Sequence, residues 1–153
     1  MQSVDTRALD ALSRDIDKLL REAPRMRREL HEELAEVMKR TVDTSIAGAL
    51  NDSHGKIQSW QERYVGTGGG YAVVRPLKGE TGPNSPGAIT NYLESGHKIR
   101  SATTSAKRRR RSRARMAYVD GRHFYSQSAK DVEAPAIAAA QKLVDRMAKI
   151  LEG

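Results

Sequence analysis

The chain has 153 residues, which is long enough for one domain with its own core. Hydrophobic residues make up 38% of the sequence but aromatic residues only 5%, which predicts a modest, mostly aliphatic core. Cysteine is absent, so disulfide bonds and thiolate metal sites are excluded. No apolar run approaches the roughly 20 residues that span a bilayer, and the polar N-terminus lacks a signal-peptide pattern. We therefore expect a soluble protein with no membrane partner.

Positive charge is concentrated in one segment. The chain has 27 Lys and Arg against 19 Asp and Glu, and nine of the basic residues lie between Lys98 and Arg115, where there is no acid. The rest of the chain has 18 basic and 19 acidic residues, so it is nearly neutral. Because like charges at this density repel one another, we expect a flexible basic loop over residues 98–115.

The N-terminal third of the sequence is typical of helix. Apolar residues recur three and four apart from Leu9 to Ile46, which places them on one helical face. Pro24 has no amide hydrogen and disfavours helix at the residue before it. We therefore expect a helical segment over residues 1–50 with a break or kink near Pro24. The stripe is also compatible with a coiled coil, although Pro24 interrupts its heptads.

Residues 56–77 predict a β-hairpin, because two runs with β-branched and aromatic residues flank the glycine-rich turn Gly66–Gly70. A glycine-rich loop can instead cradle phosphate when it opens a helix. Here the glycines lead into a strand pattern, which favours the hairpin. The composition of residues 78–87 indicates a loop. A final helix is expected over residues 123–152, with a kink or a later start at Pro135.

These elements predict an α+β fold in a single domain, residues 1–153. Long N-terminal helices and a C-terminal helix should pack on a small antiparallel β-sheet, with long flexible loops between the elements. The expected core contacts join the long helix to the sheet and to the final helix: Leu30, Leu34 and Val37 with Trp60 or Tyr64 and with Leu143 or Met147.

The sequence contains no arrangement of residues that is typical of catalysis. His97 and His123 flank the basic segment, where they could meet and share a metal or a proton. Each could equally bond a carbonyl at a strand end, and no acidic residue has ligand spacing to either. No serine lies in a nucleophile elbow, and no carboxylate cluster is suited to magnesium. We expect neither enzymatic activity nor a cofactor or metal.

The basic segment supplies the candidate interaction residues. Arginine pairs with phosphate in a bidentate way and keeps its charge, and a run of such residues gives salt-sensitive affinity for nucleic acid. Alternatively, the segment is a solubilising loop, a contact for an acidic protein surface, or a loop ordered only on assembly. The residues concerned are Lys107, Arg108, Arg109, Arg110, Arg111, Arg113 and Arg115.

Two short segments that flank the basic loop, ITNYLESGHKIR and AYVDGRHFY, are followed by an alanine-rich helix. This layout resembles the phage minor tail-component family, the tail-completion or head–tail joining proteins of long-tailed phages. The matching positions are Tyr92, Leu93, Glu94, Gly96 and His97, then Val119, Gly121, Arg122, His123 and Phe124.

The resemblance implies an α+β fold and a non-enzymatic structural role in the phage neck. It implies a ring of identical subunits, a hexamer, between the head connector and tail-tube proteins, with the basic loop near DNA in the lumen or near a neighbouring subunit. The protein would then be in the neck or tail of the virion, and in the host bacterial cytoplasm during assembly. The alternative function is a nucleic-acid-binding module that acts through the Arg-rich loop.

Overall fold

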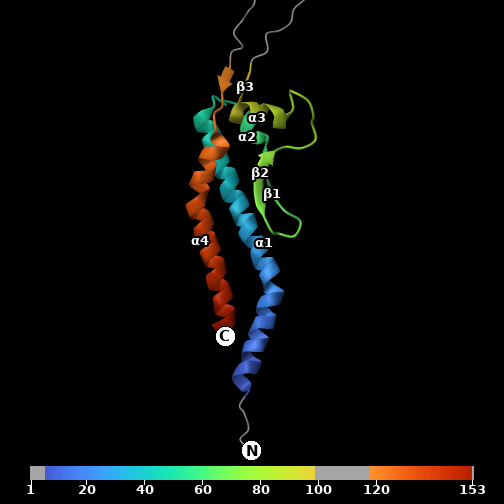
Figure 1. Cartoon of the computed structure of the whole chain (residues 1–153), viewed down its shortest axis with the longest axis vertical. Coiled ribbons are helices and arrows are strands. Elements are labelled where there is room, and N and C mark those ends of the chain that lie inside the picture. Colours follow the sequence, from blue (N-terminus) through green and yellow to red (C-terminus); the bar gives the residue numbers. More distant parts are fainter. Residues whose placement is uncertain (1–5, 99–117, 153) are drawn as a thin grey trace, which may run out of the picture.

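The fold is given by a computed structural model, which describes residues 6–98 and 118–152. Helix α1 (Arg7–Ala49) forms the long axis of the molecule, and helix α4 (Phe124–Glu152) lies beside it in the opposite direction (Figure 1). A hairpin of strands β1 (Gln61–Val65) and β2 (Ala72–Pro76) also packs against α1. The predicted α+β class is confirmed.

Helix α1 is continuous, so the predicted break near Pro24 is wrong. Proline removes one backbone hydrogen bond and crowds the preceding turn. Pro24 and Leu20 are both exposed, so water can solvate the carbonyl of Leu20 that loses its partner. Packing of the apolar stripe further along, where Met26 is only 1% exposed, stabilises the helix on the C-terminal side of the proline. Pro135 lies within α4 at an exposed position, and that helix also continues through it.

The predicted hairpin is confirmed from residue 61 onward, with Arg63 opposite Val74 in an antiparallel register. The preceding residues were expected to extend the first strand, but they form the single helical turn α2 (Lys56–Ser59). The carboxylate of Asp52 accepts hydrogen bonds from the backbone amides of Lys56, Ile57 and Gln58 at 2.9, 2.9 and 3.1 Å. This cap stabilises a helical turn where the side-chain pattern alone suggested a strand.

A third helix, α3 (Pro86–Ser95), begins in the segment expected to be a loop. The hydroxyl of Ser85 accepts from the amide of Ala88 at 3.2 Å, and Pro86 occupies the first turn. Both are favourable at a helix N-terminus. Strand β3 (Gly96–Lys98) follows directly and pairs with strand β4 (Tyr118–Asp120). The strands therefore form two separate antiparallel pairs rather than one sheet.

The centre of the core lies further along α1 than the sequence predicted. Its fully packed cluster consists of Val42 and Ile46 from α1, Val74 from β2 and Phe124 from α4. Leu34 is only half-buried, and Trp60 lies under the Lys56 ammonium, 5.2 Å from the ring centre, outside this cluster. The periodicity identified the buried face of α1, but the position of greatest burial depends on where α3 and α4 meet.

Ile46→Ala should reduce the free energy of unfolding by about 2–5 kcal/mol, because Ile46 is fully buried and truncation leaves a cavity. Leu77→Ala is the control, since Leu77 is 41% exposed and its truncation should change stability by about 0.5 kcal/mol or less. Denaturant unfolding followed by circular dichroism measures both. A loss below about 1 kcal/mol for Ile46→Ala would contradict the position of the core.

Candidate functional site

The residues of the two flanking motifs meet at one place, which we call the motif junction: Leu93–His97 and Tyr118–Tyr125. The backbone amide of Arg122 donates to the carbonyl of Leu93 at 2.7 Å, and the amide of His123 donates to the carbonyl of Glu94 at 3.2 Å. Strands β3 and β4 pair beside these contacts, with His97 opposite Val119. Segments separated by the whole basic run are thus held against each other.

Glu94 caps the N-terminus of α4 from the end of α3. Its carboxylate accepts hydrogen bonds from the amides of Tyr125 and Ser126 at 3.0 and 3.3 Å, and from the Ser126 hydroxyl at 3.2 Å. The first amides of a helix have no partner within the helix and favour a negative charge. A residue about 30 positions away therefore serves as the cap, and it ties the start of α4 to α3.

Two glycines allow the motif junction to close. A side-chain carbon at Gly96 would overlap the carbonyl of Val119, and one at Gly121 would overlap the carbonyl of Glu94. Gly96 also has a φ of 78°, a conformation that other residues rarely adopt. The glycine positions of the two motifs are therefore explained by a close backbone crossing.

Phe124 and Tyr125 connect the motif junction to the core. Phe124 is completely buried in the cluster with Ile46 and Val74. The Tyr125 hydroxyl donates to the Gln61 amide oxygen, and the Gln61 amide nitrogen donates to the Thr90 hydroxyl at 3.3 Å. Burial, and secondarily the charge of Glu94, raises the pKa of Tyr125 to about 12. This polar network was not predicted, because the residues that form it come from three distant parts of the chain.

The two histidines of the motifs occupy different environments. The His97 ring packs against Tyr92 with ring centres 5.2 Å apart, and its buried Nδ1 has no hydrogen-bond partner in the described part of the chain. His123 is exposed and has a φ of 53° at the residue before α4. Within residues 6–98 and 118–152, no group of three or more His, Asp or Glu side chains is placed to hold a metal ion.

The motif junction also fixes the ends of the basic segment. Lys98, the last residue of β3, is paired with Tyr118, the first residue of β4. The Tyr118 hydroxyl donates to the carbonyl of Ser95 at 2.9 Å, which further ties the two ends. The predicted interaction residues from Lys107 to Arg115, and the loop around them, lie outside the described residues. Both ends of that segment are attached at the end of the molecule opposite the start of α1 (Figure 1).

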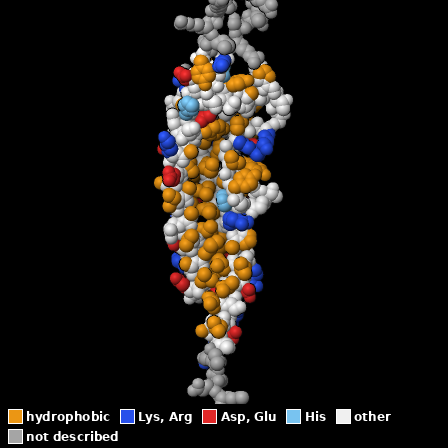
Figure 2. All heavy atoms as spheres, in the orientation of Figure 1, with side chains coloured by type: hydrophobic (Ala, Val, Ile, Leu, Met, Phe, Trp, Pro, Cys, Tyr) orange, Lys and Arg blue, Asp and Glu red, His pale blue; other side chains and the backbone are white. Residues whose placement is uncertain are grey.

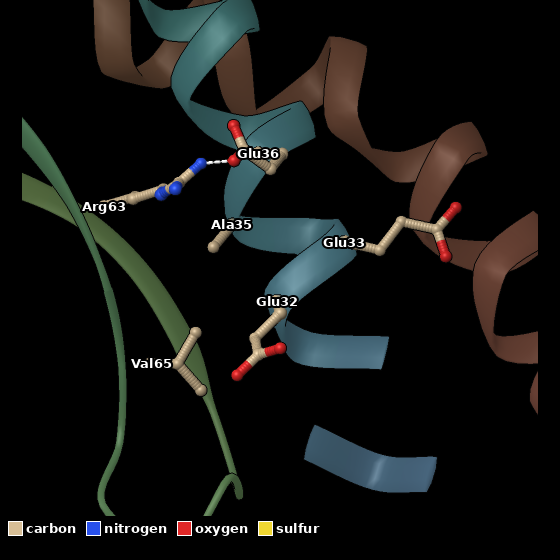
Figure 3. Close-up of a pocket in the computed structure, with 6 residues that line it drawn as sticks. All are labelled: Glu32, Glu33, Ala35, Glu36, Arg63 and Val65. Atoms are coloured by element: carbon tan, nitrogen blue, oxygen red, sulfur yellow. Dashed lines mark ion pairs between the residues drawn. The ribbon is translucent and has the colours of Figure 1, made fainter. Parts of the chain in front are cut away.

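A groove of about 490 Å³ lies between α1 and β1, and three glutamates, Glu32, Glu33 and Glu36, are among the residues that line it. Figure 3 shows Arg63 reaching from β1 to form an ion pair with Glu36 of α1. Glu32 is paired with Arg28 at 2.9 Å, and Glu33 lies 3.9 Å from the Lys142 ammonium. Because each carboxylate has a basic neighbour, this groove is a set of surface ion pairs, each of modest energy. It does not resemble a catalytic centre.

A large apolar surface remains uncovered on the two long helices. On the N-terminal part of α1, four large side chains are 42–67% exposed: Leu9, Leu12, Ile16 and Leu20. On α4, Ile137, Val144 and Leu151 are 64%, 56% and 40% exposed. Figure 2 shows hydrophobic side chains in a continuous column along these helices. We call these seven residues the apolar face. Contiguous exposed apolar surface of this kind is typical of an interaction site.

The sequence contained a signal for the α4 part of the apolar face. Its apolar residues form two stripes rather than one. Val132, Leu143 and Met147 lie on the partly buried side of the helix. Ile137, Ala140, Val144, Ala148 and Leu151, spaced three and four apart, are all exposed. A helix with two such stripes has more apolar surface than one neighbouring helix can cover.

Comparisons with known proteins leave the chain without an identified relative. A scan against protein-family models, a search of curated proteins and a search of solved structures each returned no match. The resemblance to the phage tail-completion family therefore stays a prediction based on the motif residues. Across the described residues, no helix is long and apolar enough to cross a membrane.

Gly121→Ala should reduce the free energy of unfolding by about 1–3 kcal/mol, because the added carbon overlaps the Glu94 carbonyl. Glu94→Ala should cost about 1 kcal/mol through the loss of the cap of α4. Gly68→Ala is the matched control, since a carbon there meets nothing within 4 Å. Thermal or denaturant unfolding compares the three. Equal stability of the Gly121 and Gly68 variants would contradict the close crossing.

Tyr125 should make the protein less stable in alkaline solution. The phenol stays protonated in the folded state up to a pKa of about 12, whereas the ordinary value is 10.0. At pH values between these two pKa values, the unfolded chain binds fewer protons than the folded chain. The free energy of unfolding therefore falls as pH rises. Tyr125→Phe should weaken this alkaline dependence. Denaturant unfolding at several alkaline pH values tests this, and an unchanged slope in Tyr125→Phe would exclude it.

Proposed function

We propose that this protein is a non-enzymatic structural component of the phage neck, which completes or joins the tail at the head–tail connector as part of an oligomeric ring. The observation that carries the proposal is the apolar face. An elongated body with seven large hydrophobic side chains exposed on its two long helices is suited to assembly with other subunits. The neck location comes from the resemblance at the motif junction.

The distribution of chemical groups in the described residues supports assembly more than catalysis. The groove between α1 and β1 is occupied by ion pairs with Arg63, Arg28 and Lys142. The polar network around Tyr125 ties helices together and is connected to the buried core. Residues of both motifs hold the motif junction closed. Their role in the described structure is therefore architectural.

The motif junction gives the basic segment a defined place in such an assembly. Its two ends are paired side by side at one end of the body, and the apolar face extends toward the other. A ring of such subunits, with their long axes along the ring axis, would present the basic segments together at its rims. Arginine-rich segments gathered around a central opening would attract the phosphates of DNA that passes through it.

The assembly is tested with the full chain. Light scattering after gel filtration should give a mass several times the 17.0 kDa of one chain. Disruption of the gene in the phage that encodes it should leave heads and tails unjoined, as seen by electron microscopy. Complete, infectious particles without the protein would refute the neck function, whatever the oligomeric state.

A five-fold variant tests the basic segment separately. With Arg108, Arg109, Arg110, Arg111 and Arg113 changed to Ser, the chain should still fold and assemble, because no residue of the described core is changed. DNA retention in particles should fall. If the protein acts instead as a free nucleic-acid-binding module, its affinity for DNA should fall, and the salt dependence of binding should become less steep by roughly one unit per lost phosphate contact. Normal particle yield and infectivity would exclude a required role for these arginines.

A further inference from the structure

We propose that the uncovered end of α1 packs on the exposed apolar stripe of α4 in a second copy of this chain. The proposal rests on the self-association in the proposed function and names the surfaces that associate. The evidence for it is the position, the length and the exposure of two apolar stripes, one at the start of α1 and one on α4.

The first step is that α4 ends before it covers all of α1. The two helices run antiparallel, and ion pairs join Glu29 to Arg146 and Glu33 to Lys142. If this register continues, Glu152 at the end of α4 lies level with Ala23 of α1. Figure 1 shows that the start of α1 extends beyond the end of α4.

The second step is that this extension is amphipathic and that its large apolar side chains are exposed in the part of the chain that the structure describes. The stripe that is buried or half-buried at Met26, Leu30 and Leu34 continues back to Leu20 and Leu9, which are 67% and 65% exposed. An isolated helix of this length is marginal in water. A partner that covers the stripe would therefore stabilise the helix and remove its leucines from water.

The third step is that the exposed stripe of α4 matches this extension. From Leu9 to Leu20 the α1 stripe spans 11 residues, and from Ile137 to Leu151 the α4 stripe spans 14 residues. At about 1.5 Å per residue these are about 16 and 21 Å. The small side chains of Ala140 and Ala148 alternate with larger ones and leave room for leucine side chains between them.

The fourth step places the two stripes relative to each other. In the antiparallel register, the α4 stripe lies level with residues 24–38 of α1, directly after the uncovered α1 stripe along the molecule. A two-fold axis perpendicular to the helices near Ala23 therefore brings the α1 stripe of each copy level with the α4 stripe of the other. One contact of this kind covers both stripes and closes as a dimer with a basic segment at each end, so a ring built from such dimers requires a second contact between them.

Self-pairing of the α1 ends fits less well. An antiparallel pair that matches Leu12 with Ile16 of the second copy also brings the two half-buried Asp15 carboxylates together, and like charges repel. A parallel pair avoids this contact but leaves Ile137, Val144 and Leu151 exposed. Packing of α1 on α4 of the second copy covers both surfaces.

Engineered cysteines test the contact, because the chain has no cysteine of its own. Ile16→Cys and Val144→Cys are prepared as separate full-length variants, one with a larger tag, and mixed under mild oxidation. The expected result is a disulfide between the two differently sized chains. Within one copy, residues 16 and 144 are separated along the axis of the helix pair by the length of about 15 helical residues, roughly 20 Å. This distance is too long for a disulfide. Asp17→Cys, an exposed neighbour of Ile16, replaces it as the matched control and should not cross-link to Val144→Cys.

The outcomes separate this inference from the proposed function. Cross-linking of Ile16→Cys only to itself, or equal cross-linking of the Asp17 control, would overturn the inference. Circular dichroism under reducing conditions checks the fold of each variant, and Leu12→Cys with Ala140→Cys is the second pair if either one unfolds. If wild-type protein is oligomeric by light scattering and neither pair cross-links, the inference is wrong while self-association stands. A monomeric wild-type protein would refute both the inference and the ring.

Discussion

The close crossing at the motif junction is the constraint on which the rest of the structure depends. The backbone of Gly121 passes so near the Glu94 carbonyl that no side chain fits between them. Once the two segments touch, the Glu94 carboxylate can reach the first amides of α4. The cap sets where α4 begins, which in turn places Phe124 in the core against Ile46. The line that α4 then follows along α1 determines how much of α1 stays uncovered.

This arrangement separates two kinds of surface on one elongated body. The apolar face lies on the long helices, while the paired ends of the basic segment lie beside the motif junction. An apolar contact between subunits depends little on salt, whereas attraction between arginines and phosphates is strongly screened. If subunits assemble through the apolar face, as proposed, salt should weaken that assembly less than it weakens contact of the basic segment with a charged partner.

The sequence predicted the fold class and the order of the main elements, because the helical periods and the glycine-rich turn are local signals. It misplaced features that depend on distant groups. Pro24 was read as a break, yet its exposed position allows α1 to continue. Residues 56–59 were read as strand because Asp52 was not recognised as their cap. The motif residues from Tyr92 to Phe124 were singled out by a family resemblance, and their role in closing the junction needed the positions of both glycines.

The pairing of β3 with β4 has a further consequence for how this chain can vary. The ends of the 19-residue segment between Lys98 and Tyr118 are held by backbone hydrogen bonds and by the Tyr118 hydroxyl, independently of the sequence between them. For a chain tethered at two fixed points, each doubling of length costs only about 0.6 kcal/mol in closure entropy. A change in the number of residues between Lys98 and Tyr118 should therefore cost the described body little stability.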